Sequence, residues 1–480
     1  MYVHVLYNSL TTVDWCDVGR RVTIDMLPDV ALLEIFDFYV HELPLISAWQ
    51  ALVHVCRNWR NIVFGSPCRL DMQLLCKAST PVRETLDVWP PLPIIAYDQG
   101  AAWSVDNVIA LLERSDRICD LALTQLSSSL LEIILKAMQQ PFPVLTRLKL
   151  QYHQFLDETA PVVPASFLDG SAPRLQELTL VSIPFPGLPN LLLSATHLIT
   201  LELWDICHSG YFTPESMVTA LSVLTRLETL DIRFKCPRCR PDRKRRRPPP
   251  QTRTPLPALA LIKFKGVSEY LEDILAWIDA PMLFKMDITF FHQLIFDIPR
   301  STMFISHTFG SEAYCRAHVT FSDCDVSVEF PSEFPSHAHG GLYLRVSCSQ
   351  PDWQLSSVTQ VCSSSFHPTL IPAVEHLYIR KRHYSELHWE DNAEGGQWLE
   401  LLHLFTAVKE LRISWQFTSS IAHALKELVG ESVIEVLPAL ETLIFEEPLS
   451  SASGHDKGII GQFVAARRLA GHYIALDIPY

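Results

Sequence analysis

The feature that most constrains the fold is an apolar pattern, Leu-x-x-Leu-x-Leu, which returns along most of the 480 residues. Clear copies occupy residues 145–150, 175–180, 198–203 and 227–232, so successive copies begin 30, 23 and 29 residues apart. Weaker copies occupy residues 118–123, 259–264, 374–379, 408–413 and 440–445. A short strand followed by a helix cannot bury its leucines alone, whereas a stack of such units buries them between neighbours.

The repeat spacing is typical of leucine-rich repeats. Helices are expected between the strands, over residues 128–138, 213–224, 268–278 and 421–429. This alternation predicts an α/β fold, a leucine-rich-repeat solenoid in which a curved parallel sheet carries helices on its outer face. The repeat length varies and no asparagine ladder marks the turns, so we expect the solenoid to be irregular.

The pattern is nearly lost over residues 285–370. Residues 317–321 and 342–346 still alternate and are expected to be strands separated by bulky loops. Two interpretations stay open for this section, an irregular continuation of the repeats or a separate small β-rich insert.

A second informative stretch lies near the N-terminus, where residues 26–40 carry apolar side chains in almost every direction around a helix. Pro28 suits the first helical position, because its φ is fixed and its missing N–H is not needed there. Asp29 then places a carboxylate in the first turn, where the helix dipole favours it. Val30, Leu33 and Phe36 lie along one side, and further apolar residues fill a neighbouring side, so one packed face cannot use them all.

A second helical run extends from Pro44 to Val63, and Gly65 and Pro67 end it. The two runs predict a compact set of three short helices. A piece of about 40 residues is near the lower limit for an independent core, so its surplus of apolar surface is better explained by a partner protein. The alternative is an ordinary helical cap on a larger fold.

The order Leu27-Pro28, Leu33, Ile35-Phe36, Leu52, Val55-Cys56-Arg57 and Trp59-Arg60 resembles an F-box, the helical motif that docks onto the Skp adaptor of cullin-RING (SCF) ubiquitin ligases. With the degenerate repeats and a tail like residues 463–469, the chain resembles the large F-box families of mushroom-forming (basidiomycete) fungi. Residues 41–48 depart from the family, because this link is longer and less acidic than usual. The resemblance implies an adaptor-facing surface, with Trp59 mainly a packing anchor, formed by Leu27, Pro28, Leu33, Ile35, Phe36, Leu52, Val55 and Trp59.

These features divide the chain into four parts. We expect a poorly ordered lead-in at residues 1–24, the F-box-like helical module at 25–67, a Pro-rich connector acting as a hinge at 68–103, and the repeat domain at 104–480. A basic loop at residues 235–255 interrupts the repeat domain.

The net charge, the cysteine distribution and the lengths of the apolar runs argue against several classes of protein. The net charge of −14 argues against broad nucleic-acid binding, because a phosphate backbone requires an excess of Lys and Arg. The 12 Cys are scattered, and no secretory signal is recognisable, so a reducing compartment, cytoplasmic or nuclear, is expected. No run of about 18 apolar residues occurs, so no membrane association is predicted.

Candidate chemical sites are few. Cys236 and Cys239 have the C-x-x-C spacing of half a zinc site or a redox pair, but no second ligand pair follows nearby, so the pair is interpreted as a coincidence in a loop and no metal is predicted. The histidines of residues 376–388 lack metalloprotease spacing and are interpreted as surface loop. No catalytic residues and no cofactor are predicted. A basic run is a candidate nuclear-import signal or an exposed insertion, and consists of Arg243, Lys244, Arg245, Arg246 and Arg247.

The sequence therefore favours a non-catalytic substrate receptor of an SCF-type ubiquitin ligase. Its N-terminal helices would bind the Skp adaptor and, through it, cullin, while the repeat domain would hold a protein substrate and raise its concentration near the ubiquitin-charged enzyme. The alternative is a leucine-rich-repeat interaction scaffold outside any ligase, whose N-terminal helices cap the array.

Overall fold

The computed structural model describes residues 24–42, 48–66, 70, 73–76, 81–97, 104–153, 160–241, 253–293, 296–309, 314–332, 340–365, 370–382, 395–428, 430–446 and 454–477. The chain forms two compact units, Met1–Ala96 and Tyr97–Tyr480. The expected lead-in, up to residue 23, lies outside the described residues.

The first unit is mainly helical. After a short 3-10 turn, η1 (Ile24–Met26), it contains α2 (Asp29–Glu42), α3 (Ala48–Val53) and α4 (Arg57–Gly65). Pro28 precedes α2 by one residue, and its carbonyl oxygen accepts the N–H of Leu32 at 3.1 Å, so it caps the helix where the first helical position was predicted.

The second helical run is broken in two. Cys56 is extended, and its Sγ accepts the N–H of Trp59, which caps the start of α4. A side chain that bonds the backbone two or three residues on competes with helix continuation, and this explains why the apolar period runs on while the helix does not.

The expected connector contributes to the packed first unit. It carries β1 (Leu74–Cys76), α5 (Val82–Val88) and β2 (Ile94–Tyr97), and β1 pairs with β2 in parallel. Leu70 and Leu92 are buried in the same core as the helices, and Trp89 packs against it. The prolines of this stretch predicted a hinge. In the structure, apolar residues of the same stretch pack into the core of the first unit.

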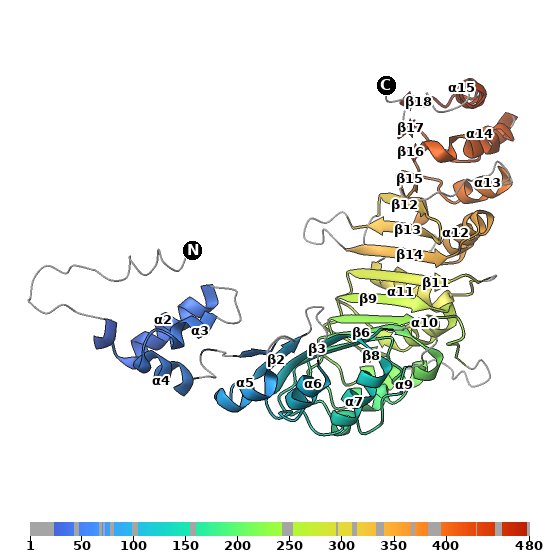
Figure 1. Ribbon diagram of the computed structural model, residues 1–480. Helices are drawn as coiled ribbons and strands as arrows, with labels where there is room; N and C mark the ends of the chain where they lie inside the picture. The colour runs from blue at the N-terminus through green and yellow to red at the C-terminus, as the bar shows by residue number, and fades with distance from the viewer. Residues whose placement is uncertain are drawn as a thin grey trace, which may run out of the picture. The chain divides into compact units, whose positions relative to one another are not determined.

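The second unit is a mixed α/β structure built on a large, mostly parallel sheet (Figure 1). Its helices lie along one side of that sheet in Figure 1. In spatial order the strands are β3-β4-β5-β6-β7-β9-β11-β14-β13-β12-β15-β16-β17-β18. Their bounds are β3 (Ile118–Leu126), β4 (Arg147–Tyr152), β5 (Glu177–Val181), β6 (Thr200–Ile206), β7 (Thr229–Phe234), β9 (Leu261–Gly266), β11 (Lys285–Phe291), β12 (Arg316–Phe321), β13 (Asp325–Pro331), β14 (Gly341–Ser347), β15 (His376–Lys381), β16 (Glu410–Ile413), β17 (Thr442–Phe445) and β18 (Ala475–Asp477).

Helical segments connect most of these strands, and all four helices expected between repeats are present with ends shifted by a few residues. The α-helices are α6 (Val105–Leu112), α7 (Ser128–Ala137), α8 (Leu188–Leu192), α9 (Pro214–Leu221), α10 (Ser268–Leu275), α11 (Pro299–Phe309), α12 (Pro351–Ser365), α13 (Gly395–His403), α14 (Thr418–Lys426) and α15 (Gly454–Leu469). The 3-10 turns are η2 (Phe167–Gly170), η3 (His208–Gly210), η6 (Ile371–Ala373), η7 (Trp415–Phe417) and η8 (Gly430–Ile434), and a small separate sheet pairs β8 (Thr254–Pro255) with β10 (Ile278–Asp279).

The repeated leucines form continuous rows across the sheet. Leu148 of β4 lies opposite Leu178 of β5, which lies opposite Leu201 of β6. A second row follows two residues further along each strand, and both rows are buried. Because strand residues alternate between faces, the residues between these rows lie on the opposite, open face of the sheet.

Three strand ends share a left-handed residue. Gln125, Ser182 and Asp205 have φ values of 51°, 58° and 55°. The sheet register shifts at two of these sites, between Leu123 and Leu126 and between Leu203 and Ile206. An extra residue in this conformation shifts the alternation of side chains between the two faces of the sheet by one position. Two buried residues that are three positions apart can therefore both face the core.

The section at 285–370 continues the large sheet, so a separate β-rich insert is wrong. β12, β13 and β14 form antiparallel pairs, while β14 pairs in parallel with β11 and β12 in parallel with β15. β11 was not among the predicted strands, although Leu283, Met286 and Ile288 fit the repeat pattern with methionine in place of one leucine.

Candidate functional site

The helices of the first unit pack around aromatic residues. Phe36 of α2 is fully buried, and its ring centre lies 4.7 Å from that of Trp59. Trp49 of α3 packs against Phe64 and Trp89, and its indole N–H donates to the carbonyl oxygen of Gln73 at 2.9 Å. The large side chains on the inner sides of α2, α3 and α4 therefore pack against one another in one core.

A different side of α2 leaves large apolar side chains in solvent. Val30, Ile35 and Phe38 are 64%, 45% and 69% exposed. Val30 and Phe38 are two helical turns apart, and Ile35 precedes Phe38 by one turn, so the three residues lie within about 140° around the helix axis, with the exposed Glu34 between Val30 and Phe38. We call this side the α2 apolar face. Met26 before the helix and Val55 after α3 are also exposed.

The predicted adaptor-facing residues divide into three groups. Pro28, Ile35 and Val55 are exposed, as a contact surface requires. Leu27, Leu33 and Trp59 are half-buried and pack against the core. Phe36 and Leu52 are buried in the core of the module.

Met26, Val30 and Phe38 are not among the predicted adaptor-facing residues, although all three are exposed apolar side chains. The signal was present, because apolar residues surround α2 in almost every direction and only one side could pack inward. Which side packs depends on where α3 and α4 lie, and the helical period does not contain that information.

The open face of the large sheet is the second candidate surface. It carries charged and aromatic side chains that contact one another across strands. The Arg233 guanidinium lies 4.9 Å from the Trp204 ring centre and forms two 2.8 Å hydrogen bonds to the buried carboxylate of Asp231. The ammonium of Lys285 lies 5.1 Å from the Tyr343 ring. Such cation–π contacts hold polar side chains in fixed positions on an otherwise solvated surface.

His318 and Glu329 are two of the titratable groups on this face whose pKa values are shifted. Burial lowers the pKa of His318, and the charges of Arg380 and Arg316 lower it further. Burial raises the pKa of Glu329, which lies opposite His318 in the sheet, against the opposing effect of Arg345. Both shifts follow from partial desolvation of the sheet face.

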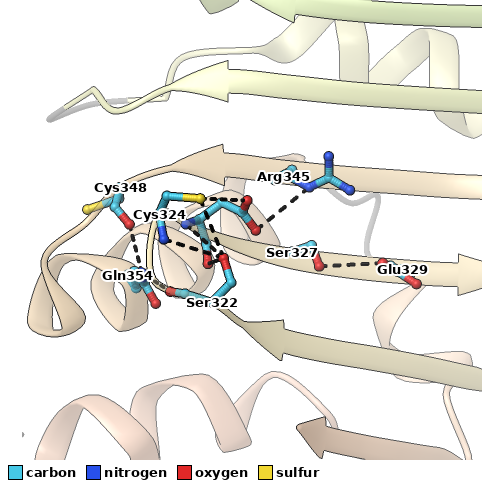
Figure 2. A network of polar contacts seen from close by, with 8 residues as sticks. Ser322, Cys324, Ser327, Glu329, Arg345, Cys348 and Gln354 are labelled. Atoms are coloured by element: carbon cyan, nitrogen blue, oxygen red, sulfur yellow. Dashed lines mark hydrogen bonds and ion pairs between the residues drawn. The ribbon is translucent and has the colours of Figure 1, made fainter. Parts of the chain in front are cut away.

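A polar network joins the turn between β12 and β13 to the start of α12 (Figure 2). The buried amide of Gln354 donates to the carbonyl oxygens of Ser322 and Cys348 at 2.8 and 2.7 Å. The Ser322 hydroxyl accepts the N–H groups of Cys324 and Asp325. These contacts are to backbone groups, so the network fixes a turn and gives no reason to infer chemistry at this place.

The other predicted features are placed as follows. Cys239 is buried, and burial together with Cys236 raises the pKa of its thiol to about 12, which makes it a poor nucleophile. Among the described residues, no three His, Cys, Asp or Glu side chains are arranged to hold a metal ion. His376 lies 3.7 Å from a carboxylate oxygen of Glu410. The basic run 243–247 and the histidines at 383 and 388 lie outside the described residues.

No protein-family model and no curated protein matches this chain. Within the ranges that the structure describes, none of the helices combines the length and the apolar character that a membrane span requires.

Proposed function

We propose that the chain is a substrate receptor of an SCF-type ubiquitin ligase, in which the first unit acts as an F-box and binds a Skp-type adaptor. The observation that carries the proposal is the α2 apolar face, because Val30, Ile35 and Phe38 are exposed although the module has a complete aromatic core beside them. Exposed apolar patches of this kind mark protein interfaces. The F-box-like order of residues 27–60 supports the choice of partner.

The second unit would hold the protein to be ubiquitinated, and the chain itself would catalyse no reaction. We infer that the second unit is an irregular leucine-rich-repeat solenoid. The buried rows, the strand–helix alternation and the recurring left-handed residue at strand ends support this inference. A protein bound by the second unit would be tethered to the same chain as the adaptor-binding module, which would raise its effective concentration near the ligase.

The test is co-purification of the full-length chain with a purified Skp-type adaptor. The informative variant is Ile35→Asp with Phe38→Asp, because both side chains are exposed and the substitutions leave the core unchanged. A buried Ile or Phe side chain is worth about 1.5–3 kcal/mol, and a desolvated carboxylate adds a further penalty, so adaptor affinity should fall by about a hundredfold or more.

The control is Val88→Asp, which introduces one carboxylate, against two in the test variant, at a residue of α5 that is 83% exposed. It should bind the adaptor like the wild type, and all three proteins should have the same circular dichroism. Full adaptor binding by the Ile35/Phe38 variant would contradict the proposed site. If neither the wild type nor the variants bind the adaptor, the non-ligase scaffold with a helical cap becomes the better description.

A further inference from the structure

We propose that Cys236 and Cys239 are a redox-active pair, a modification site at which a disulfide forms by exchange with a small oxidised disulfide such as oxidised glutathione. The two residues follow β7 and enclose Pro237 and Arg238. The C-x-x-C spacing alone does not require such a role, but the structure adds a turn, a contact between the two thiols and a difference in their exposure. The proposed reaction involves neither the adaptor nor a substrate of the ligase.

A turn brings the two cysteines together. Pro237 and Arg238 form this turn, so Cys236 and Cys239 are its first and fourth residues. The first and fourth Cα atoms of a turn lie within about 7 Å of each other, and a disulfide usually joins Cα atoms about 4.4–6.8 Å apart. The two thiols are hydrogen-bonded to each other, so the sulfur atoms are already close. The bond can therefore form with little movement of the backbone.

Hydrogen bonds hold the backbone on both sides of the pair. The N–H of Lys235 donates to the carbonyl oxygen of Ile206 at 2.9 Å, which ties the residue before the pair to β6. The N–H of Arg240 donates to the carbonyl oxygen of Arg238 at 3.0 Å, and its Nε donates to that of Pro237 at 3.2 Å. A turn restrained in this way reduces the entropy that is lost when the two sulfurs react.

The two sulfurs differ in their access to solvent. Cys239 is 1% exposed, whereas Cys236 is partly exposed. Burial, with a further contribution from Cys236, raises the pKa of Cys239 to about 12, so this thiol is protonated at neutral pH. Of the two, only Cys236 can meet an oxidant from solution, and Cys239 is placed to react with a sulfur that is already attached to Cys236. Exchange through a mixed disulfide requires these two positions.

The exchange proceeds in two steps. The thiolate of Cys236 attacks one sulfur of oxidised glutathione, the S–S bond of glutathione breaks, and one glutathione leaves as a thiolate. The Cys239 thiol then loses its proton and attacks the Cys236 sulfur of the mixed disulfide, which expels the second glutathione. Two protein thiols are oxidised, one glutathione disulfide is reduced, and the two protons from the protein pass to the two glutathione thiolates.

A third thiol lies nearby and is the main competitor. Cys207 follows the neighbouring strand β6, and it contributes to the raised pKa of Cys239. Its Sγ lies 3.1 Å from the Oγ of Ser209, whereas the thiols of Cys236 and Cys239 bond each other. We therefore expect the disulfide to form within the turn and not between the turn and β6.

The test incubates the purified full-length chain in buffers with different ratios of reduced to oxidised glutathione, blocks the remaining thiols by alkylation and maps the disulfides by mass spectrometry. Trypsin cleaves after Arg238, so two peptides that stay linked report a bond between Cys236 and Cys239. The same buffers with urea give the equilibrium constant of the bond in the unfolded chain, which keeps the spacing and loses the turn. The exposed Cys324, whose Sγ contacts a carboxylate, is an internal control that should carry only glutathione.

We expect the equilibrium constant of bond formation to be about tenfold or more larger in the folded chain than in urea, because the turn holds the thiols together. In Cys239→Ser, glutathione should remain on Cys236, since no second thiol expels it. In Cys236→Ser, the buried Cys239 should carry no glutathione. Cys207→Ser should form the linked peptides like the wild type.

Three results would each overturn the proposed pair. They are an equilibrium constant that is no larger in the folded chain, a disulfide to Cys207 in place of the expected one, and glutathione on Cys239 of the folded Cys236→Ser variant. Cys236→Ser replaces a partly exposed side chain, so it keeps the test valid if Cys239→Ser does not fold.

Discussion

Arg467 of α15 gives the sharpest stability prediction, because its side chain is fully buried and bonds only to backbone in the contacts described. Its guanidinium donates to the carbonyl oxygens of Val433 and Val436 at 3.1 and 3.0 Å, and to those of Leu437 and Pro438 at 3.1 and 3.2 Å. It therefore caps the carbonyl end of η8 and the turn after it. Replacing it with methionine keeps much of the volume and removes every donor.

The cost follows from which carbonyls lose their partner. Leu437 retains a backbone donor, since its carbonyl oxygen also accepts the N–H of Leu440 at 3.0 Å. The carbonyls of Val433 and Val436 bond the guanidinium in a buried setting, and each unsatisfied group costs about 1–3 kcal/mol. Removal of a buried charge offsets part of this, because burial already lowers the pKa of Arg467. We expect Arg467→Met to cost about 3 kcal/mol.

The assay is native-state hydrogen exchange of the amides in η8 and α15, since stability in a repeat array is local and a single unfolding midpoint does not report it. A loss of about 3 kcal/mol should speed exchange by about a hundredfold. The control is Arg468→Met on the same helix, where the side chain is exposed and exchange should change little. If Arg467→Met leaves the exchange of both segments within a few-fold of the wild type, the reasoning about the buried cap is refuted.

Further predictions concern single residues of the second unit. Gly341 has a φ of 122°, and a Cβ there would lie 2.3 Å from a backbone oxygen of β13, so Gly341→Ala should lower the free energy of unfolding by about 2 kcal/mol or more. Gly458 of α15 has open space around it, so Gly458→Ala should stabilise the protein slightly. Thermal unfolding of both variants checks the opposite signs of the two effects. Burial raises the pKa of Glu272 despite hydrogen bonds from the backbone of α11, so its favourable contribution to stability exists at low pH and is lost as pH rises through the folded-state pKa. The stability of Glu272→Gln relative to wild type should therefore increase with pH between about 4 and 7 in denaturant titrations, and a difference that falls with pH would contradict this assignment.

The sheet of the second unit was the most predictable part of the fold. Every strand expected from the repeat pattern is present, because Leu148, Leu178 and Leu201 must be buried and only strand stacking buries all of them. β13 and the order β11-β14-β13-β12-β15 could not be predicted, since an antiparallel strand has the same alternation as a parallel one.

The candidate contact surface was predictable only in part. The excess of apolar residues in α2 was visible in the sequence. The F-box resemblance placed Phe36 and Leu52 among the adaptor-facing residues, whereas both are buried here and Val30 and Phe38 are exposed. A helix period shows which residues share a side, whereas burial is decided by the partners of that side, here Trp59 and the core around it.

The α2 apolar face leads to a prediction about salt. Val30, Ile35 and Phe38 are exposed apolar side chains outside the core of the first unit. If a Skp-type adaptor binds at this face, as we propose, binding buries apolar area, which salt does not screen as it screens exposed charges. The adaptor affinity should therefore change little when the salt concentration of the binding assay is raised, and a steep loss of affinity with salt would contradict an apolar contact.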